Sequence, residues 1–470
     1  MKSVYLIGIG GIGMSALARF FKRKGYAVSG YDKTPSDLTE RLVLEGIPVH
    51  YVDDPGCLPG DTDNTLVVYT PAVPEGLGEL MAAKESGHTI MKRSQVLGLI
   101  ARRNPCIAVS GTHGKTTVTT LVAHIFTESG EGCTAFMGGI SRNYDSNLLF
   151  SPGKTLVVEA DEYDRSFLEL DPGSAVITGI EADHLDSYGS LSSLRLAFKE
   201  FAGRVTGILI IKKGTGVGRD DTRAKVLTYH LSDASADFHA ADIRRAGKGC
   251  FLFDIHYPGG ILRDVRTCIP GEMNVENAVA AAALAICHGI PPGTVRSAIG
   301  SFLGVKRRLE VHVDTPMVAY VDDYAHHPTA IRAGIAAIRD IFPGRHVTAV
   351  FQPHLFSRTK ALAAEFGQAL SGADRVVLTD IYPAREDPIP GVSPELVFDG
   401  ITCQDRILIR KDDLLDYVEK EDFDVLVTFG AGDIGCCASQ IKDILKKKND
   451  GILVEWSNNP INNNRKMTNK

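Results

Sequence analysis

The chain has 470 residues, 44% of them apolar, which is enough for several ordinary cores, so we expect two to four domains. Its 51 basic and 57 acidic residues leave a formal charge of −6, which argues against a protein that coats nucleic acid or an anionic membrane. The nine cysteines are scattered and include no C-x-x-C pair, so we expect neither a disulfide scaffold nor a zinc ribbon, and a reducing, cytoplasmic compartment fits. No apolar run reaches the roughly 18 residues that a membrane-spanning helix needs.

Short apolar runs that end in glycine turns alternate with helical patterns along the whole chain, which is typical of parallel α/β layers. In the first unit, 1–103, we predict strands at Val4–Ile9, Ala27–Tyr31 and Thr65–Tyr69. In the second unit, 104–305, we predict strands at Cys106–Ser110, Leu156–Ala160, Ala175–Gly179 and Gly207–Ile211. In the third unit, 306–447, we predict strands at Met317–Val321, His346–Phe351, Arg375–Thr379 and Asp424–Phe429. The remaining segment, 448–470, is rich in Lys and Asn and is predicted to be disordered.

A glycine-rich pattern, G-x-G-x-x-G, follows the first predicted strand and precedes a helix; its glycines are Gly8, Gly10 and Gly13, with Gly11 inside it. Asp32 stands at the end of the next strand. Such a loop holds a pyrophosphate on backbone N–H groups and a helix N-terminus, and the carboxylate can bind a ribose. NAD is the usual ligand of this pattern, but any nucleotide diphosphate satisfies the same physics. A tight turn without a ligand is the structural alternative.

A second glycine loop, Ser110-Gly111-Thr112-His113-Gly114-Lys115-Thr116-Thr117, lies between a predicted strand and a predicted helix. Its amides can wrap phosphate, Lys115 can reach the β- and γ-phosphate oxygens, and the Thr116 hydroxyl can bind Mg²⁺. We therefore expect replacement of Lys115 to abolish turnover and to leave the fold intact. The pattern departs from the full phosphate-loop motif because Val109 stands where the first glycine would be.

Acidic residues follow two further strands of the second unit. Glu159, Asp161 and Glu162 come at the end of one strand, and Glu159 leaves it first, which makes it the natural partner for Mg²⁺. His184 follows the next strand among carboxylates and is a second candidate metal ligand. A solvated acidic turn and a structural histidine are the alternatives.

Several short motifs in this order together resemble the Mur ligases over roughly 2–445. Beside the G-T-H-G-K-T-T loop, they are E-A-D-E, E-A-D-H-L-D, the Asn-x-x-Asn of Asn274 and Asn277, Arg307-Arg308, D-D-Y-A-H-H-P at 322–328, F-Q-P-H at 351–354 and G-A-G-D at 430–433. The resemblance implies an α/β fold of three domains: a Rossmann-like N-terminal domain for a UDP-sugar, a central P-loop ATPase-type domain with a mostly parallel sheet, and a Rossmann-like C-terminal domain for an amino acid.

The resemblance also implies an enzyme, an ATP-dependent amide-bond-forming ligase, and favours the member that adds L-alanine to UDP-N-acetylmuramate in peptidoglycan precursor synthesis. The implied route passes through an acyl phosphate, with ATP and Mg²⁺ as cofactors, and needs no protein nucleophile. A ligase that reattaches recycled tripeptide to the same nucleotide sugar is the alternative within the family. A nucleotide-binding dehydrogenase or a regulatory NTP-binding module is the alternative from another class. We expect a monomer or homodimer with no nucleic-acid or membrane partner.

The site residues implied by the resemblance fall into four sets. The UDP-sugar is expected at Gly8, Gly10, Gly11, Gly13 and Asp32. ATP is expected at Gly111, Thr112, His113, Gly114, Lys115, Thr116, Thr117, Asn274, Asn277 and Arg308, with metal at Thr116, Glu159 and His184. The reacting carboxylate and the amino acid are expected at Tyr324, His326, His354 and Arg358. Lys199, 15 residues after His184, is expected to act as a carbamoylated, metal-holding lysine, with an ordinary surface lysine as the alternative.

Overall fold

The structure is a computed structural model that describes residues 2–181, 188–384 and 386–458. From residue 450 onward, only the backbone is described. The chain divides into two compact units, Met1–Val305 and Lys306–Lys470. The first unit holds two sheets and the second holds one. This agrees with the predicted α/β class, whereas the predicted boundary at 103/104 falls inside the first compact unit.

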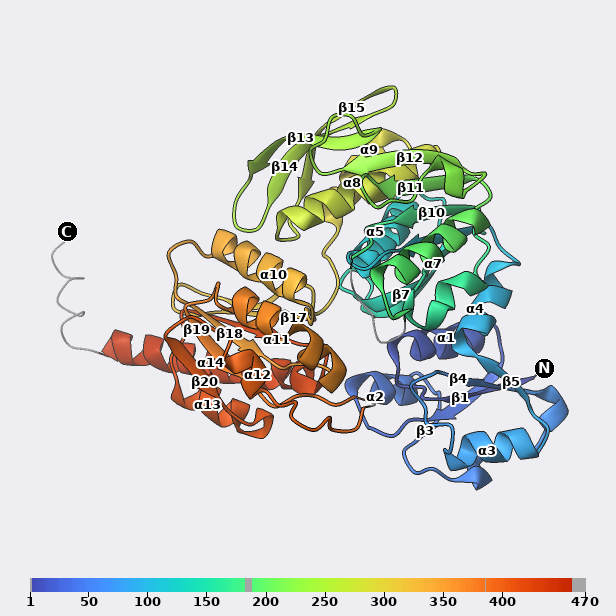
Figure 1. Cartoon of the computed structure of the whole chain (residues 1–470), viewed down its shortest axis with the longest axis horizontal. Helices are drawn as coiled ribbons and strands as arrows, with labels where there is room; N and C mark the ends of the chain where they lie inside the picture. The colour runs from blue at the N-terminus through green and yellow to red at the C-terminus, as the bar shows by residue number, and fades with distance from the viewer. Residues whose placement is uncertain (1, 182–187, 385, 459–470) are drawn as a thin grey trace. The chain divides into compact units, whose positions relative to one another are not determined.

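The first sheet of unit 1 is parallel, with the order β3-β2-β1-β4-β5. It belongs to the blue part of the chain in Figure 1. Its helix α1 begins directly after the glycine loop and buries Met14, Leu17 and Ala18, spaced so that they share one face. The elements are β1 (Ser3–Ile7), α1 (Ile12–Arg23), β2 (Ala27–Tyr31), α2 (Asp37–Leu44), β3 (Val49–His50), β4 (Thr65–Tyr69), α3 (Gly78–Glu85), β5 (Thr89–Lys92) and α4 (Arg93–Ala101).

The second sheet of unit 1 has ten strands in the order β15-β14-β13-β12-β11-β10-β6-β9-β7-β8. Its core includes α8, whose buried run Ala280–Ala285 has only small and medium side chains and packs against α5. The elements are β6 (Cys106–Ser110), α5 (Lys115–Glu128), β7 (Thr134–Ser141), β8 (Ser146–Phe150), β9 (Leu156–Glu159), β10 (Ser174–Ile177), α7 (Leu191–Arg204), β11 (Ile208–Lys212), β12 (Lys225–His230), β13 (Phe238–Arg245), β14 (Phe251–Tyr257), β15 (Gly260–Thr267), α8 (Glu272–Cys287) and α9 (Pro292–Ser301).

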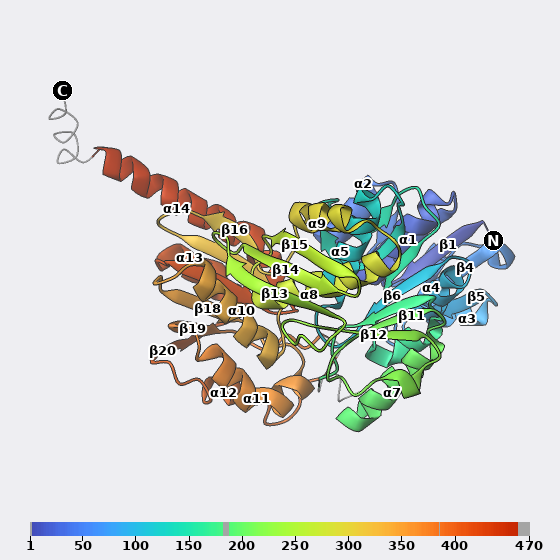
Figure 2. The same cartoon turned by 90° about the horizontal axis from the view of Figure 1, so that it is seen from above.

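Two antiparallel parts of this sheet were not predicted from the sequence. One is the β7–β8 hairpin, and the other is the β13–β14–β15 meander, whose strands lie side by side in Figure 2. A single disulfide joins Cys250 to Cys268, a pair that the sequence analysis did not predict, and the other seven cysteines, all among the described residues, are free. The pairing of Phe251 with Thr267 places the two flanking cysteines opposite each other, a relationship that their separation in sequence does not reveal.

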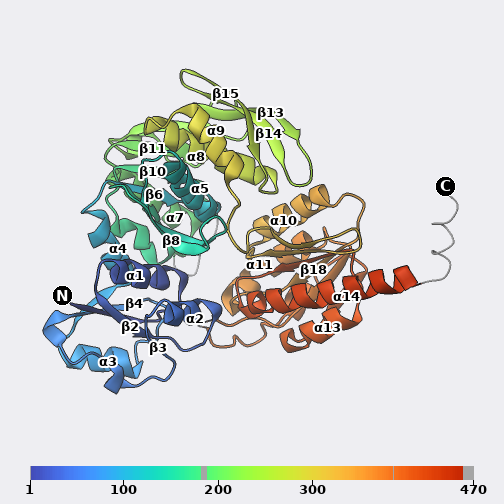
Figure 3. The same cartoon turned by 180° about the vertical axis from the view of Figure 1, so that it is seen from behind.

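The sheet of unit 2 has the order β16-β17-β21-β18-β19-β20 and is parallel except for its β16 edge. Helix α14 packs against α13 (Figure 3) and continues to Asn458, so the chain is helical beyond residue 447, where disorder was predicted to begin. The elements are β16 (Glu310–Asp314), β17 (Ala319–Asp323), α10 (Pro328–Ile341), β18 (Val347–Phe351), α11 (Phe356–Leu370), β19 (Arg375–Leu378), α12 (Glu395–Phe398), β20 (Asp405–Leu408), α13 (Leu414–Lys420), β21 (Val425–Phe429) and α14 (Ala438–Asn458).

Within the described residues, no helix combines the length and the apolar character needed to cross a bilayer.

Candidate active site

The second glycine loop joins β6 to α5, as the sequence predicts. Gly114 is the N-cap of α5 with φ 81°, a left-handed conformation that glycine adopts without steric cost. The Thr112 amide donates to the Gly179 carbonyl (3.0 Å), and the Thr112 hydroxyl accepts from the Glu181 amide (3.1 Å). Nε2 of His113 lies 3.4 Å from a Glu181 carboxylate oxygen. These contacts hold the loop against the segment after β10, so the conformation of the loop depends on the sheet.

Lys115 is held at the start of α5 by two groups. Its ammonium donates to the Gly111 carbonyl (2.7 Å) and to the Glu162 carboxylate (2.8 Å), and the Glu162 side chain is completely buried. Burial alone would lower the pKa of Lys115, but the carboxylates of Glu162, Asp161 and Glu159 outweigh it, so the net pKa is raised and the ammonium stays charged. This geometry revises the expectation that Lys115 can be removed without cost to the fold, because the buried Glu162 carboxylate would lose its ion pair with Lys115.

The predicted metal ligands Thr116 and Glu159 lie together. The Thr116 hydroxyl donates to Oε1 of Glu159 (3.0 Å), and the amide of Gly138 in β7 donates to Oε2 (2.8 Å). A hydroxyl and a carboxylate are oxygen donors of the kind Mg²⁺ prefers, with phosphate and water completing its shell, so the pair fits this ion. His184 lies outside the described residues. Among those described, no group of three or more His, Cys, Asp or Glu side chains is arranged to hold a metal.

Asn274 and Asn277 lie in the first two turns of α8, beside the phosphate loop. The Asn274 amide donates to the Pro270 carbonyl (2.7 Å), and the Asn277 amide donates to Oδ1 of Asn274 (2.9 Å). A Cβ added to Gly114 would lie 2.6 Å from Oδ1 of Asn277. Asn277 therefore contacts the loop itself, while Asn274 orients Asn277. Thr117, the third residue of α5, is buried.

The first glycine loop joins β1 to α1, and Asp32 lies beside it. Both Asp32 oxygens accept backbone N–H groups, Oδ2 from Gly10 (2.7 Å) and Oδ1 from Thr34 (3.1 Å). Asp32 thus shapes the loop in this structure, and its contact with a ribose stays a prediction. The loop amide of Gly11 donates to the Gly8 carbonyl (3.2 Å), which closes a tight turn ahead of α1.

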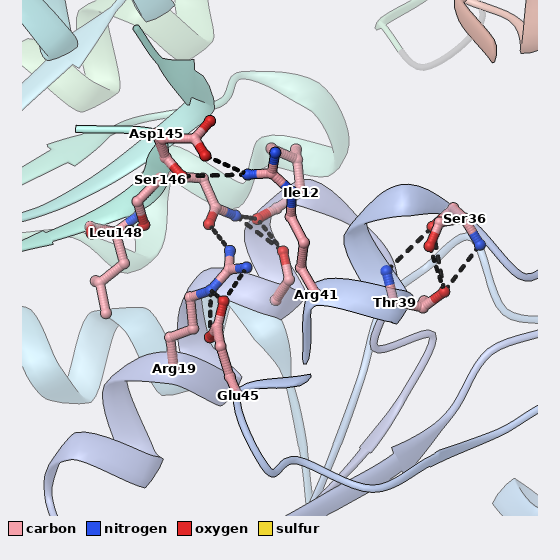
Figure 4. A network of polar contacts seen from close by, with 11 residues as sticks. Ile12, Arg19, Ser36, Thr39, Arg41, Glu45, Asp145, Ser146 and Leu148 are labelled. Atoms are coloured by element: carbon pink, nitrogen blue, oxygen red, sulfur yellow. Dashed lines mark hydrogen bonds and ion pairs between the residues drawn. The ribbon is translucent and has the colours of Figure 1, made fainter. Parts of the chain in front are cut away.

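A polar network ties the glycine-loop helix α1 to the β7–β8 hairpin, within unit 1. Arg19 of α1 forms a bidentate ion pair with Glu45, while Arg41 of α2 reaches Asp145 (2.9 Å; Figure 4). Asn147 of β8 accepts from the Arg19 guanidinium and donates to the Ser15 hydroxyl at 2.8 Å. The first helix turn after the loop is thereby fastened to the hairpin whose Gly138 amide holds Glu159.

In unit 2, the predicted residues after β17 and β18 form one cluster. The ring of His326 lies 5.3 Å from that of Tyr324 and 6.0 Å from that of His354. Nη1 of Arg358 lies 3.4 Å from Nδ1 of His354. The carboxyl ends of the parallel strands meet at this edge, which brings residues from distant parts of the sequence together. Tyr382, which the sequence analysis did not single out, stacks on His354 at 5.7 Å.

Arg307 and Arg308 have different roles although they are adjacent. The Arg307 guanidinium donates to the buried Asp322 (2.8 Å) and to the Gly430 carbonyl (2.7 Å), so it anchors β17 to the loop after β21. Both guanidiniums lie over the Tyr324 ring of the cluster, Arg307 at 5.4 Å and Arg308 at 5.2 Å from its centroid, so the two arginines differ in the anchoring bonds of Arg307. The structure therefore leaves Arg308, rather than Arg307, as the candidate for a ligand contact.

Lys199 lies on α7, and its ammonium is 3.1 Å from the carboxylate of Asp221. The Lys199 side chain is 43% exposed. Carbamoylation needs a neutral amine, which burial favours, whereas an exposed lysine with a carboxylate partner matches an ordinary surface ion pair. The carbamate stays a prediction that this arrangement does not favour.

Models of one protein family match three consecutive parts of the chain. They are described as the Mur ligase family catalytic domain at 3–105, the Mur ligase middle domain at 109–285, and the Mur ligase glutamate ligase domain at 307–432. The UDP-N-acetylmuramate–L-alanine ligase of Porphyromonas gingivalis is 46% identical over 455 residues, which cover 95% of this chain and 99% of that protein. The chain belongs to the Mur ligase family.

Other relatives of this Mur ligase agree. The UDP-N-acetylmuramate–L-alanine ligase of Flavobacterium psychrophilum is 45% identical over 457 residues, covering 95% of this chain and 99% of that protein. The crystal structure of the UDP-N-acetylmuramate–alanine ligase of Thermotoga maritima matches with a TM-score of 0.83 and 26% identity, over 95% of this chain and 100% of that one. A murein peptide ligase from Psychrobacter arcticus shares the fold, with a TM-score of 0.72, 21% identity and coverage of 95% and 99%.

Sequence reasoning missed three side-chain contacts at or beside the candidate sites of this Mur ligase. It assigned no role to Asn147, it did not single out Tyr382, and it did not pair Glu162 with Lys115. Glu162 could have been found, since its carboxylate follows a strand of the sheet that carries the phosphate loop. Asn147 and Tyr382 belong to no motif, and only the folded chain brings them to their partners.

Proposed function

We propose that this chain joins L-alanine to UDP-N-acetylmuramate and converts ATP to ADP and phosphate, in the cytoplasm and as a monomer or homodimer. The observation that carries the proposal is the near full-length identity of 43–46% to ligases named for this reaction. The phosphate loop and its oxygen ligands support ATP use independently of that similarity.

The chemistry needs positioning and charge neutralisation more than it needs a protein nucleophile. The lactyl carboxylate of the nucleotide sugar attacks the γ-phosphorus of ATP, which forms an acyl phosphate and releases ADP. The amino group of L-alanine then attacks the acyl carbon, and the tetrahedral intermediate expels phosphate as the amide forms. Lys115 supplies a fixed positive charge beside the phosphates, where negative charge develops.

Thr116 and Glu159 are the described residues that would hold Mg²⁺, and His184 is proposed as a further ligand. A bound Mg²⁺ would neutralise phosphate charge and orient the oxygens of the transferred group. The Gly138 amide keeps the Glu159 carboxylate turned toward Thr116.

In unit 2, we propose that Arg308 contacts the transferred phosphate and that Tyr324, His326, His354 and Arg358 receive the amino acid and the reacting carboxylate. The cluster places two histidines and a guanidinium within contact of each other, which suits a carboxylate ligand. Both histidine rings are flanked by tyrosines, Tyr324 and Tyr382, so their orientations are restrained by packing.

The test is release of phosphate from ATP with UDP-N-acetylmuramate and, separately, L-Ala, Gly, L-Ser or an L-Ala-containing tripeptide. We expect L-Ala to be preferred and Gly and L-Ser to be poor substrates. The preference is limited in size, since one methylene or hydroxyl changes the binding free energy by only about 1–3 kcal/mol in a small pocket. Efficient use of the tripeptide would instead indicate the recycling ligase. Hydride transfer to NAD without phosphate release would indicate a dehydrogenase, and ATP binding without turnover would indicate a regulatory module.

A further inference from the structure

We infer that Arg93 binds the diphosphate of the UDP-sugar at the first glycine loop. The inference rests on the proposed function, because it assigns a cation to the nucleotide-sugar site. Arg93 is the first residue of α4 and directly follows β5, which ends at Lys92. It belongs to no motif in the sequence.

Arg93 lies at the edge of the sheet that carries the glycine loop. In the parallel register, Ile7 at the end of β1 pairs with Tyr69 of β4, and Tyr69 pairs with Lys92. The loop after β1 and the start of α4 therefore leave the sheet on the same side, two strand spacings or about 10 Å apart. A long side chain is needed to cover that distance.

The Arg93 side chain spans this distance, and its guanidinium lies next to Gly13. A Cβ added to Gly13 would lie 2.9 Å from Nη1 of Arg93 and 3.1 Å from its Cδ. Because the Cα–Cβ direction in a helix tilts toward its N-terminus, the guanidinium lies beside the first turn of α1. The absence of a side chain at Gly13 is what makes room for this cation.

The first turn of α1 is itself set up for an anion. It has no side-chain cap and no acidic residue. The N–H groups at the start of a helix have no intrahelical acceptor and carry partial positive charge. Arg93 adds a full charge and a planar donor fork that matches phosphate oxygens.

The charge balance of the loop explains why such a cation is needed. Asp32 already places a carboxylate on the Gly10 amide, which by itself would repel a diphosphate. The nearby cations Arg19 and Lys92 are paired with Glu45 and Asp164. By contrast, the guanidinium of Arg93 has no hydrogen-bond or ion-pair partner among the described residues.

The experiment compares UDP with UMP as calorimetric ligands of the full-length enzyme, since the two differ only in the second phosphate. We expect the wild type to prefer UDP, Arg93→Ala to lose about 10- to 100-fold in UDP affinity with UMP affinity nearly unchanged, and Arg93→Lys to recover part of the loss. Arg102→Ala is the matched control. It alters the other end of the same helix, where Arg102 forms an exposed pair with Asp171, and its UDP affinity should equal that of the wild type.

Steady-state kinetics separates ligand binding from a packing role. Arg93→Ala should raise KM for UDP-N-acetylmuramate by a similar factor and leave KM for ATP within about twofold. An Arg93→Ala enzyme that keeps the wild-type preference for UDP over UMP would overturn the inference and leave the proposed function intact. A wild-type enzyme that binds neither nucleotide would overturn both.

Discussion

The guanidinium of Arg19 in α1 donates a hydrogen bond to the side-chain oxygen of Asn147 in β8, and both side chains are buried. The Asn147 amide in turn donates to the Ile12 carbonyl and to the Ser15 hydroxyl, in the first turn of α1. One asparagine therefore satisfies three groups of the helix that follows the glycine loop. Because α1 follows β1 of the first sheet and β8 belongs to the second, the network joins the two sheets of unit 1.

Replacement of Asn147 by Ala should destabilise unit 1 by about 1–3 kcal/mol, since buried donors and acceptors lose their partner. The measurement is the free energy of unfolding in urea. Arg41→Ala is the control, because Arg41 of α2 contacts the same β7–β8 hairpin at Asp145 through an exposed pair, which is worth at most about 1 kcal/mol. Equal effects of the two substitutions would show that burial of the Asn147 network contributes nothing.

Lys115→Ala should reduce kcat by at least about 100-fold, because a fixed charge beside the reacting phosphates is lost. It should also destabilise the fold by about 3–5 kcal/mol, because the buried Glu162 carboxylate loses its ion pair with Lys115. Addition of Glu162→Gln should restore most of the stability and none of the activity. Single-turnover kinetics and urea unfolding of the three proteins test this, and a Lys115→Ala enzyme within about tenfold of wild-type activity contradicts the assignment.

Gly114 and Gly130 form a matched pair at the two ends of α5, with φ of 81° and 82°. An alanine at either position incurs the same backbone strain, about 1–2 kcal/mol. Only at Gly114 does the added methyl meet a neighbour, Oδ1 of Asn277 at 2.6 Å, whereas Gly130 has open space. Gly114→Ala should therefore raise KM for ATP at least about tenfold, and Gly130→Ala should leave it unchanged while lowering the melting temperature. The prediction is wrong if Gly114→Ala and Gly130→Ala have the same KM for ATP.

Alkaline pH should unfold the protein steeply, because burial raises the pKa of several groups. The thiols of Cys106 and Cys133 shift from 9.0 to about 12, and the Tyr144 hydroxyl shifts from 10.0 to about 12. The folded chain holds these protons to higher pH than the unfolded chain does, so their stabilisation is complete below about pH 9 and is lost as the pH rises through 12. In Tyr144→Phe, the free energy of unfolding should fall less steeply between pH 10 and 12; an unchanged slope argues against this cause.

Lys199→Ala and Asp221→Asn should behave alike and stay near wild-type activity if the ion pair between them is the role of Lys199. That is the outcome we expect from the exposed position of Lys199. A carbamate predicts the opposite: only Lys199→Ala loses activity, short carboxylates restore it, and mass spectrometry finds the added mass at Lys199.

The sequence by itself determined the α/β class, the family and the two glycine loops. These depend on local order: an apolar strand, glycines at fixed spacing and a helix start are contiguous, so their spacing alone predicts backbone amides that can bind phosphate. The acidic residues after β9 were predictable for the same reason, since strand ends of one parallel sheet meet at one edge.

Only the tertiary structure decided which side chains partner each other. Asp32 accepts the Gly10 amide, a partner that the sequence did not predict, and Lys115 pairs with Glu162. Asn147 reaches α1 from another sheet, and Arg93 reaches Gly13 across two strands. These contacts depend on strand order, register and side-chain direction, which arise when distant segments pack and are not encoded in the spacing of neighbouring residues.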